Sequence, residues 1–582
     1  MREAMKRLDV LKLVLLPLLL AVVSVHGAVK QYDWTIDYAF WSPDCVEKLI
    51  IAINGQYPGP TIDATVGDTI VVKIHNKMPT ESVVIHWHGM LQRGTPWADG
   101  AAYVSQCPIA PHDEYTYQFV VENAGTYFYH GHHGMQRANG FYGSLIVRPP
   151  NGTVEPFTYD EELSIIVNDW WHKPVHDQEL GLLINPIRWV GDPQSLLIEG
   201  RGAYNCSLVP VGADSKSADR TCNASAPQCQ PYVLPVTPGK TYRLRIASVA
   251  SVNSLNFVLE GHNMMVVEAD GHYVEPVVMD NLDVYSGESY SILFTANQDP
   301  TRNYWAGLNI RGRNATTPTG LAVLNYLPNP STMLPTTPAP VSPLWNDFNL
   351  SLAKAKLIKA HSSLKIPFTK TSRSDKTLFL LNTQNKVDGV TKWAINNITL
   401  VPVSTPYLAA YTHKKLKNVF STSPPPPLSY TPGYDIFQPP VNPNATVGTG
   451  VYEFKLNEVI DVVLQNTNML AANTSEIHPW HLHGHDFYVL GMGNGVFSSN
   501  EYDRLNFVNP PLRNTVPLFP YGWTVIRFRA DNPGVWPFHC HIEPHFHMGM
   551  GVIFAEGVDL LPKMHLPAQN MGCGLTRNLI RG

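Results

Sequence analysis

The chain has 582 residues, a formal net charge of -5 and 15% charged residues. The charged fraction is below the ~25% of an average soluble protein. No basic block or acidic tail occurs, which argues against a nucleic-acid partner. With 49 prolines and 41 glycines, the composition is typical of short strands joined by turns. A chain of this length is too long to fold around one hydrophobic core, so several domains are expected.

Residues 1–28 predict a signal peptide. Basic residues precede the apolar run 13–25, and the small residues Gly27 and Ala28 follow at the expected cleavage position. The run is shorter than the ~20 residues of a membrane span, so we expect a soluble secreted protein. Eight N-x-S/T sequons support that route as predicted glycosylation sites: Asn151, Asn205, Asn223, Asn314, Asn349, Asn397, Asn444 and Asn473.

Strand-like segments dominate the mature chain. They are rich in β-branched and aromatic residues, often alternate, and are bounded by Gly, Pro and Asn, as at residues 68–76, 144–150, 241–249, 289–297 and 523–532. Helical periodicity is scarce. The sequence therefore predicts an all-β protein built from sandwiches.

One pattern occurs twice: a strand, a histidine pair, an aromatic strand and a second histidine pair. It spans residues 67–132 and again 457–541, whereas His262 and His272 in the middle form no pair. This predicts two metal-bearing domains on either side of a metal-free one. After the signal peptide we place the domains at residues 29–153, 154–372 and 373–582. The proline-rich run 327–345 predicts a surface linker, and 423–444 is a second such run within the last domain.

The histidine pairs share the spacing H-x-H: His86/His88, His130/His132, His481/His483 and His539/His541. Because residues i and i+2 of a strand point to the same face, each motif presents two imidazoles side by side. Imidazole binds Cu, Zn and Fe. A single motif would more often be alternating surface or core histidines, but four in equivalent places predict metal sites. Eight imidazoles suit three ions with open positions.

Cys540 lies between His539 and His541, so its side chain points to the opposite face. His478 precedes His481 by three residues and also faces away from its pair, so the thiol and this imidazole could meet there. A thiolate, two imidazoles and a weak thioether form a blue-copper site. His545 and Met550 are the downstream candidates for the second imidazole and the thioether. The alternation of side chains along a strand does not exclude Met548 as the thioether.

The alternative role for Cys540 is a disulfide. The chain has seven cysteines, an odd number, so a metal-bound Cys540 leaves six for three disulfides, with 15 pairings open. The backbone of Cys540 leads directly to His539 and His541, so an electron would travel few covalent bonds between the two sites. Four coppers could store the four electrons that reduce O2 to two waters.

Several long stretches carry a family resemblance: HWHGMLQRGTPWADG, INPIRWVGDPQSLLIEGRG, HPWHLHGHDFYVLG and ADNPGVWPFHCHIEPHFHMGMG. Over essentially the whole mature length the chain resembles the multicopper oxidase family, most closely its plant ascorbate oxidase branch. The resemblance implies three cupredoxin-like (Greek-key β-sandwich) domains in tandem and four Cu ions per chain. It also implies L-ascorbate and O2 as substrates, a homodimer, and an extracellular location in the apoplast or cell wall.

The resemblance also implies residue roles. The type 2 copper would take His86 and His481, and the type 1 copper would take His478, Cys540, His545 and Met550. The type 3 pair would take His88, His130, His132, His483, His539 and His541. The implied disulfides are Cys45–Cys229, Cys107–Cys573 and Cys206–Cys222.

The implied reductant site lies between Trp189 and Trp393 beside His545, which would pass on the electron. A flat enediol ring could stack on the indoles, although such tryptophans are otherwise core residues. Glu476 is a predicted pocket neighbour. His133, His485 and His547 receive no ligand role; we expect them to be solvated or to hydrogen-bond around the sites.

Three other functions remain open. A laccase-like oxidase of phenols is the first. A methionine as axial ligand of the type 1 copper disfavours it. A ferroxidase is the second, disfavoured because no acidic cluster accompanies the type 1 motif. A non-enzymatic cell-wall protein with this fold is the third, disfavoured because all implied ligands are present.

Overall fold

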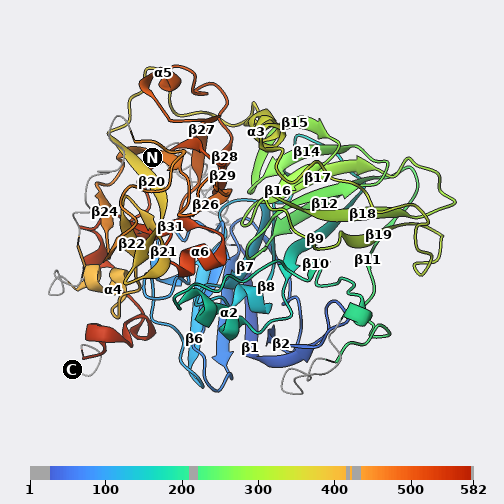
Figure 1. Ribbon diagram of the computed structural model, residues 1–582, viewed down its shortest axis with the longest axis horizontal. Helices are drawn as coiled ribbons and strands as arrows, with labels where there is room; N and C mark the ends of the chain where they lie inside the picture. The colour runs from blue at the N-terminus through green and yellow to red at the C-terminus, as the bar shows by residue number, and fades with distance from the viewer. Residues whose placement is uncertain (1–26, 209–220, 414–419, 422–433, 579–582) are drawn as a thin grey trace, which may run out of the picture.

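The computed structural model describes residues 27–208, 221–413, 420–421 and 434–578. Three cupredoxin-like β-sandwiches follow one another along the chain and meet in one central region (Figure 1). In the view of Figure 1 the first sandwich is blue, the middle one mostly green, and the last one yellow to red. Most of the predicted signal peptide lies outside the described residues.

The first sandwich has two four-stranded sheets. One has the order β2-β1-β4-β6, with β1 (Val29–Trp41), β2 (Lys48–Ile53), β4 (Thr69–Asn76) and β6 (Glu114–Val120). The other has the order β3-β8-β7-β5, with β3 (Ile62–Thr65), β5 (Ile85–His88), β7 (Gly125–Gly131) and β8 (Tyr142–Arg148). Alternation of buried and exposed residues is complete in β6, because only its inner face packs on the core.

The middle sandwich pairs a six-stranded with a five-stranded sheet. The first has the order β10-β9-β12-β17-β14-β15, with β9 (Glu161–Trp170), β10 (Ser195–Ile198), β12 (Thr241–Ser248), β14 (Met264–Ala269), β15 (His272–Met279) and β17 (Ser289–Thr295). The second has the order β11-β19-β18-β13-β16, with β11 (Tyr232–Val236), β13 (Ser254–Leu259), β16 (Leu282–Val284), β18 (Tyr304–Arg311) and β19 (Gly320–Tyr326).

The last sandwich pairs an eight-stranded with a five-stranded sheet. The first has the order β23-β22-β21-β20-β25-β30-β27-β28, with β20 (Lys376–Val387), β21 (Val390–Ile395), β22 (Ile398–Leu400), β23 (Thr446–Gly448), β25 (Val459–Asn466), β27 (Phe487–Asn494), β28 (Leu512–Arg513) and β30 (Gly522–Arg529). The second has the order β24-β32-β31-β26-β29, with β24 (Val451–Phe454), β26 (His478–Leu482), β29 (Thr515–Leu518), β31 (Gly534–Cys540) and β32 (Gly551–Glu556).

Helices are short and lie between strands or after the last strand. The α-helices are α2 (Val175–Leu182), α3 (Phe348–Leu357), α4 (Tyr407–Thr412), α5 (Ser499–Tyr502) and α6 (Glu543–His547). The 3-10 helices are η1 (Pro96–Ala98), η2 (Arg137–Asn139), η3 (Cys206–Leu208), η5 (Leu561–Lys563), η6 (Ala568–Met571) and η7 (Gly574–Asn578). Within the described part of the chain, every helix is too short or too polar to span a membrane.

The all-β prediction is confirmed, and each of the five quoted strand segments coincides with a strand: β4, β8, β12, β17 and β30. The predicted linker 327–345 runs along the middle sandwich, where Trp305 Nε1 donates to Thr337 O (3.0 Å) and Arg311 Nη1 to Pro343 O (3.2 Å). Part of the second proline-rich run lies outside the described residues.

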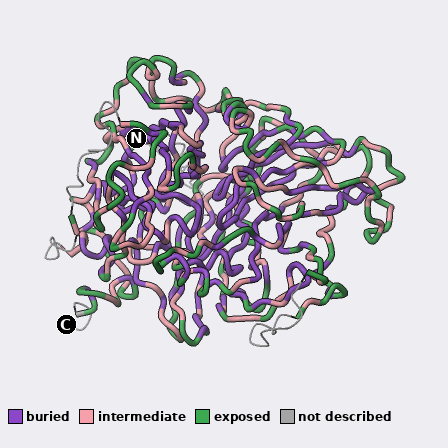
Figure 2. The backbone as a smooth tube through the Cα atoms, in the orientation of Figure 1, coloured by how far each residue is buried: buried purple, intermediate pink, exposed green. Residues whose placement is uncertain are grey.

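Three disulfides cross-link the described chain. They are Cys45–Cys229, Cys107–Cys573 and Cys206–Cys222, the pairs that the resemblance implies. Cys107–Cys573 links the first sandwich to the segment after the last one. Each sandwich has its own apolar core. The core of the last one also includes Met135, Trp171 and Tyr285 from the other two, and buried chain fills the region where the three meet (Figure 2).

Candidate metal centres

The four H-x-H motifs converge between the first and the last sandwich. In the first, β5 pairs with β7 so that His86 lies opposite His130; in the last, β26 pairs with β31 so that His481 lies opposite His539. His132, His483 and His541 follow directly after the ends of β7, β26 and β31. The repeated local geometry brings eight imidazoles to one interface.

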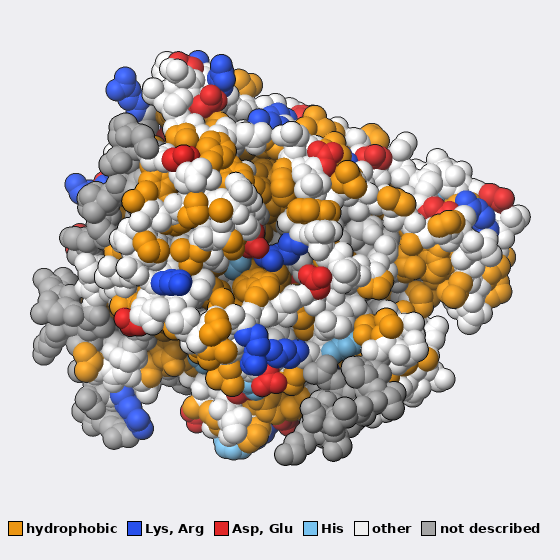
Figure 3. Space-filling view, viewed as in Figure 1, with side chains coloured by type: hydrophobic (Ala, Val, Ile, Leu, Met, Phe, Trp, Pro, Cys, Tyr) orange, Lys and Arg blue, Asp and Glu red, His pale blue; other side chains and the backbone are white. Residues whose placement is uncertain are grey.

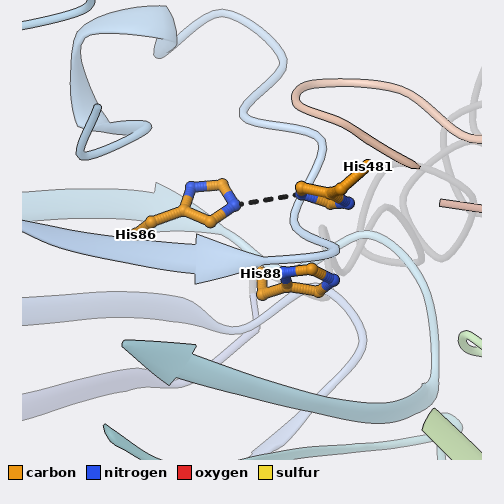
Figure 4. Close-up of side chains that lie close together, drawn as sticks. All are labelled: His86, His88 and His481. Carbon is orange, nitrogen blue, oxygen red and sulfur yellow. Dashed lines mark hydrogen bonds between the residues drawn. The ribbon is translucent and has the colours of Figure 1, made fainter. Parts of the chain in front are cut away.

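Their nitrogen atoms form three compact groups, within 4.8 Å in each: His86, His88 and His481; His88, His130 and His541; His132, His483 and His539. The Nε2 atoms of His86 and His481 are 3.3 Å apart, with the His88 ring beside them (Figure 4). His132 and His483 place their Nε2 atoms 3.3 and 3.1 Å from His539 Nε2. Every group contains histidines from both sandwiches.

Apart from the half-buried His132, these imidazoles are buried, and burial lowers the pKa of several of them. Burial, followed by the crowding of other imidazoles, lowers the pKa of His481 and His483 well below the usual 6.5. The pKa of His539 is lowered to about 3, mainly by burial. Neutral imidazoles have the free lone pairs that metal binding requires.

The second ring nitrogen of most of these histidines donates to a fixed acceptor. Backbone carbonyls accept from the Nδ1 atoms of His86 (Asp99 O, 2.8 Å), His130 (Gly131 O, 2.8 Å), His481 (Asn514 O, 2.9 Å) and His539 (Cys540 O, 2.9 Å). Such bonds fix the tautomer and direct Nε2 inward. In contrast, the buried Nδ1 of His88 has no hydrogen-bond partner among the described residues, while its Nε2 lies 3.3 Å from Thr515 Oγ1.

Three supporting side chains were not predicted. Asp99 Oδ2 accepts from His483 Nδ1 (2.9 Å), Ser286 Oγ lies 2.8 Å from His541 Nδ1, and Thr515 Oγ1 lies 3.1 Å from His481 Nδ1. Asp99 falls within a stretch that carried the resemblance, but no spacing marks the role of Asp99 or of Thr515. Ser286 belongs to the middle sandwich, where the sequence shows no metal motif.

A second group lies on the opposite side of β31. Cys540 Sγ is 3.7 Å from His478 Nδ1 and 3.8 Å from His545 Nδ1, and all three residues are fully buried. The turn into α6 returns His545 to the thiol, and Met550 is fixed nearby because Cys540 N donates to Met550 O (3.1 Å). Met548 lines a cavity whose lining also includes Cys540. Cys540 is outside the three disulfides, and burial raises its thiol pKa well above the ordinary value.

Aromatic and charged residues surround His545. Its ring centroid lies 4.8 Å from Trp393 and 5.8 Å from Trp189. Trp393 is buried, whereas Trp189 is partly exposed and lies under Arg313, whose guanidinium carbon is 5.4 Å from the ring. Glu476 Oε2 joins Arg313 Nη2 (2.9 Å) to His545 Nε2 (3.3 Å).

The Glu476 carboxylate is therefore ionised. Burial alone would raise its pKa, but Arg313 and His545 outweigh burial and hold the pKa well below the usual range. The Trp189 indole, the Arg313 guanidinium and the Glu476 carboxylate thus form a compact surface beside the group of Cys540, His478 and His545.

A cavity of about 510 Å³ reaches the eight-histidine cluster. Its lining includes His132 and His539 at the inner end, and Leu183, Lys392 and His547 farther out. Histidines without a predicted ligand role differ in their surroundings: His133 and His547 line this cavity, whereas His485 Nε2 is ion-paired with buried Glu556 (2.9 Å). Of the eight sequon asparagines, Asn397 is half-buried and the others are exposed.

The face of the molecule in Figure 3 shows Lys and Arg scattered among Asp and Glu. They do not gather there into a broad patch of one sign, in keeping with the modest net charge of -5.

Comparison with known proteins defines the class. Three family models described as multicopper oxidase match residues 35–152, 161–329 and 419–559, so the chain belongs to the multicopper oxidase family. It is 55% identical to an L-ascorbate oxidase of Cucumis sativus over 94% of this chain and 92% of that protein. A laccase of Oryza sativa is 33% identical over 94% and 95% of the two chains. The crystal structure of Fet3p, a multicopper oxidase that functions in iron import, superposes with a TM-score of 0.75 at 25% identity, covering 95% and 94%.

Proposed function

We propose that this protein is a secreted L-ascorbate oxidase that couples one-electron oxidation of L-ascorbate to reduction of O2 to two H2O. The observation that carries this proposal is the pairing of two buried donor groups, eight imidazoles on one side of β31 and Cys540 with two imidazoles on the other. The 55% identity to an L-ascorbate oxidase, against 33% to a laccase, supports ascorbate as reductant.

The donor sets fit copper. Two imidazoles, a thiolate and a neighbouring methionine suit a blue-copper site, and imidazole alone suits the other ions. The imidazoles with fixed Nδ1 hydrogen bonds, and the unpartnered Nδ1 of His88, agree with this choice. We assign four Cu per chain: type 1 at His478, Cys540, His545 and Met550; type 2 at His86 and His481; type 3 at His88, His130, His132, His483, His539 and His541. When bound, the coppers would supply one-electron acceptance from the reductant and four-electron reduction of O2.

The remaining tasks fall to the protein. Trp189 and Trp393 would bind the flat reductant beside His545, and the Arg313–Glu476 ion pair would orient it. The backbone of Cys540 gives a covalent connection from the thiol to His539 and His541. The cavity lined by His132 and His539 would admit O2. Asp99 and Thr515 would keep imidazoles in their binding orientation.

The assignment also covers the chain as a whole. We assign residues 1–28 to a cleaved signal peptide and residues 29–153, 154–372 and 373–582 to three domains, with copper bound by the first and last. The exposed sequons and three disulfides suit an extracellular, apoplastic enzyme. We further propose a homodimer, as the family resemblance implies.

The test is oxygen uptake by the purified, copper-loaded protein, with L-ascorbate and a simple diphenol compared side by side. We expect a blue sample and a strong preference for ascorbate. A blue sample that prefers the diphenol would replace the substrate by a phenol while keeping the copper assignment. A fully loaded sample without a blue band would overturn the role of Cys540.

A further inference from the structure

The middle sandwich lacks histidine pairs, yet one of its side chains reaches the supports of the cluster. Asp270 follows directly after β14 and is 1% exposed. Its Oδ1 accepts from Ser289 N (2.9 Å) within the same sandwich. Its Oδ2 accepts from Arg513 Nε (2.8 Å), Asn514 N (3.2 Å) and Thr515 N (3.1 Å) of the last sandwich. One carboxylate thus fixes three consecutive residues across a domain interface.

Two of these three residues, Asn514 and Thr515, contact the histidine cluster. His481 Nδ1 donates to Asn514 O (2.9 Å) and lies 3.1 Å from Thr515 Oγ1. Thr515 Oγ1 is also 3.3 Å from His88 Nε2. Asn514 and Thr515 therefore connect Asp270 to His481 of the last sandwich, and Thr515 connects it to His88 of the first.

The charges around Asp270 make this arrangement rigid. Arg513 Nη2 donates to Glu288 Oε1 (2.9 Å), and Arg513 Nη1 donates to Tyr290 Oη (3.1 Å). Asp270, Glu288, Tyr290 and Arg513 are all buried. A buried charge is tolerated only when it is paired and hydrogen-bonded, so removal of one partner leaves the others uncompensated. The geometry of residues 513–515 is consequently determined by the carboxylate.

We propose that Asp270 is a positioning residue, supplied by the copper-free domain, that sets the orientation of His481 and through Thr515 that of His88. This rests on the copper assignment above. Without the carboxylate, Asn514 and Thr515 lose the acceptor of their amides, and His481 loses its fixed hydrogen-bond partners. The ion bound by His86 and His481 is affected most, while the group around Cys540 is held by other contacts.

The experiment compares copper-loaded wild type with Asp270→Asn. Matched control Asp461→Asn breaks a buried carboxylate–arginine pair of the same kind, in which Arg527 Nε and Nη2 lie 2.6 and 2.8 Å from Asp461, within the β25–β30 sheet. Three readouts are taken: the blue absorption band, the electron paramagnetic resonance spectrum of the type 2 copper, and the rate of copper loss to a chelator.

For Asp270→Asn we expect an unchanged blue band, an altered type 2 spectrum and copper loss about 10- to 100-fold faster than in wild type. Asp461→Asn should lower only thermal stability. A type 2 spectrum and chelation rate equal to wild type in Asp270→Asn would overturn the proposal, as would the same changes in Asp461→Asn.

If Asp270→Asn does not fold, Thr515→Val decides. This variant keeps the side-chain shape and removes Oγ1, and it should show a smaller change of the type 2 spectrum in the same direction. A wild-type spectrum in Thr515→Val would overturn the proposal. These readouts need no reductant, so failure of the ascorbate assignment and failure of the Asp270 role are distinguishable.

Discussion

Asp99 of the first sandwich accepts a hydrogen bond from His483 Nδ1 of the last sandwich at 2.9 Å, while its backbone oxygen accepts from His86 Nδ1 at 2.8 Å. A single residue thus orients one imidazole from each of the two domains that share the cluster. Its side chain is completely buried, so water cannot replace either contact.

Asp99→Asn should therefore impair oxygen reduction. The side-chain amide of the new asparagine has one oxygen where the carboxylate has two, and in one of its orientations it presents N–H to His483 Nδ1. Loss of such a hydrogen-bond partner typically costs about 10- to 100-fold in activity or metal affinity. Oxygen uptake at saturating reductant measures the loss. The blue band should persist because Asp99 does not contact Cys540, His478 or His545. Wild-type uptake in Asp99→Asn would contradict this role.

Met550→Leu and Met548→Leu should separate the two methionines that parity alone leaves open. Both are buried, and a Met-to-Leu change conserves volume, so each should cost less than about 1.5 kcal/mol of stability. We expect Met550→Leu to shift the blue band and raise the reduction potential because the weak axial ligand is lost. Met548→Leu should leave both unchanged. Absorption spectra and redox titrations of the two variants test this. The reverse pattern would assign Met548 as the axial ligand.

Arg313→Gln should weaken binding of an anionic reductant. In wild type the guanidinium neutralises Glu476 next to Trp189; without it the carboxylate is left facing an anion. Charge-assisted hydrogen bonds contribute roughly 1.5–3 kcal/mol, so KM for L-ascorbate should rise about tenfold or more. KM for a neutral diphenol should change much less. The exposed Arg504→Gln is the control, and equal effects on both reductants would contradict a charge-based role.

Replacing Cys107 and Cys573 together by serine should lower thermal stability without removing copper. Their disulfide closes a loop with a sequence separation of 466, and such links typically stabilise by about 2–4 kcal/mol. Differential scanning calorimetry should show a lower Tm while the blue band and the oxygen uptake of the folded protein stay the same. An unchanged Tm would show that the interface contacts alone suffice.

His272→Gln should flatten part of the pH dependence of stability. His272 Nε2 is 3.0 Å from Asp486 Oδ2 across the interface of the middle and last sandwiches. Burial lowers the His272 pKa, but Asp486, with Asp270 and Glu268, outweighs burial and raises it above 6.5. The folded protein therefore holds this proton more tightly than the unfolded chain. The resulting stabilisation is complete below pH ~6.5 and is lost as pH rises through the raised value.

Thermal unfolding measured from pH 5 to 9 tests this. Wild type should lose Tm on the alkaline side more steeply than His272→Gln. The control is His361→Gln, since His361 Nδ1 is hydrogen-bonded to Ser363 Oγ (2.8 Å) and not to a carboxylate. Parallel curves for wild type and His272→Gln would contradict the ion pair.

Strand periodicity explains which parts of the centres are predictable. Residues two apart share a face, so the H-x-H pairs and the opposite orientation of Cys540 can be derived directly from the sequence. The choice between Met548 and Met550 cannot, because α6 interrupts the strand and its period. Asp99, Thr515 and Asp270 were also out of reach, since each acts across a domain interface at a sequence separation that no local pattern records.

The cluster draws imidazoles from both repeats of the same structural unit, and neither repeat alone encloses a complete group. A single ancestral unit with two H-x-H motifs could therefore have built such a site only by associating with another copy of itself. Gene duplication and fusion would then have made that association permanent. It would also have freed one copy to acquire the Cys540 group, which the first sandwich lacks.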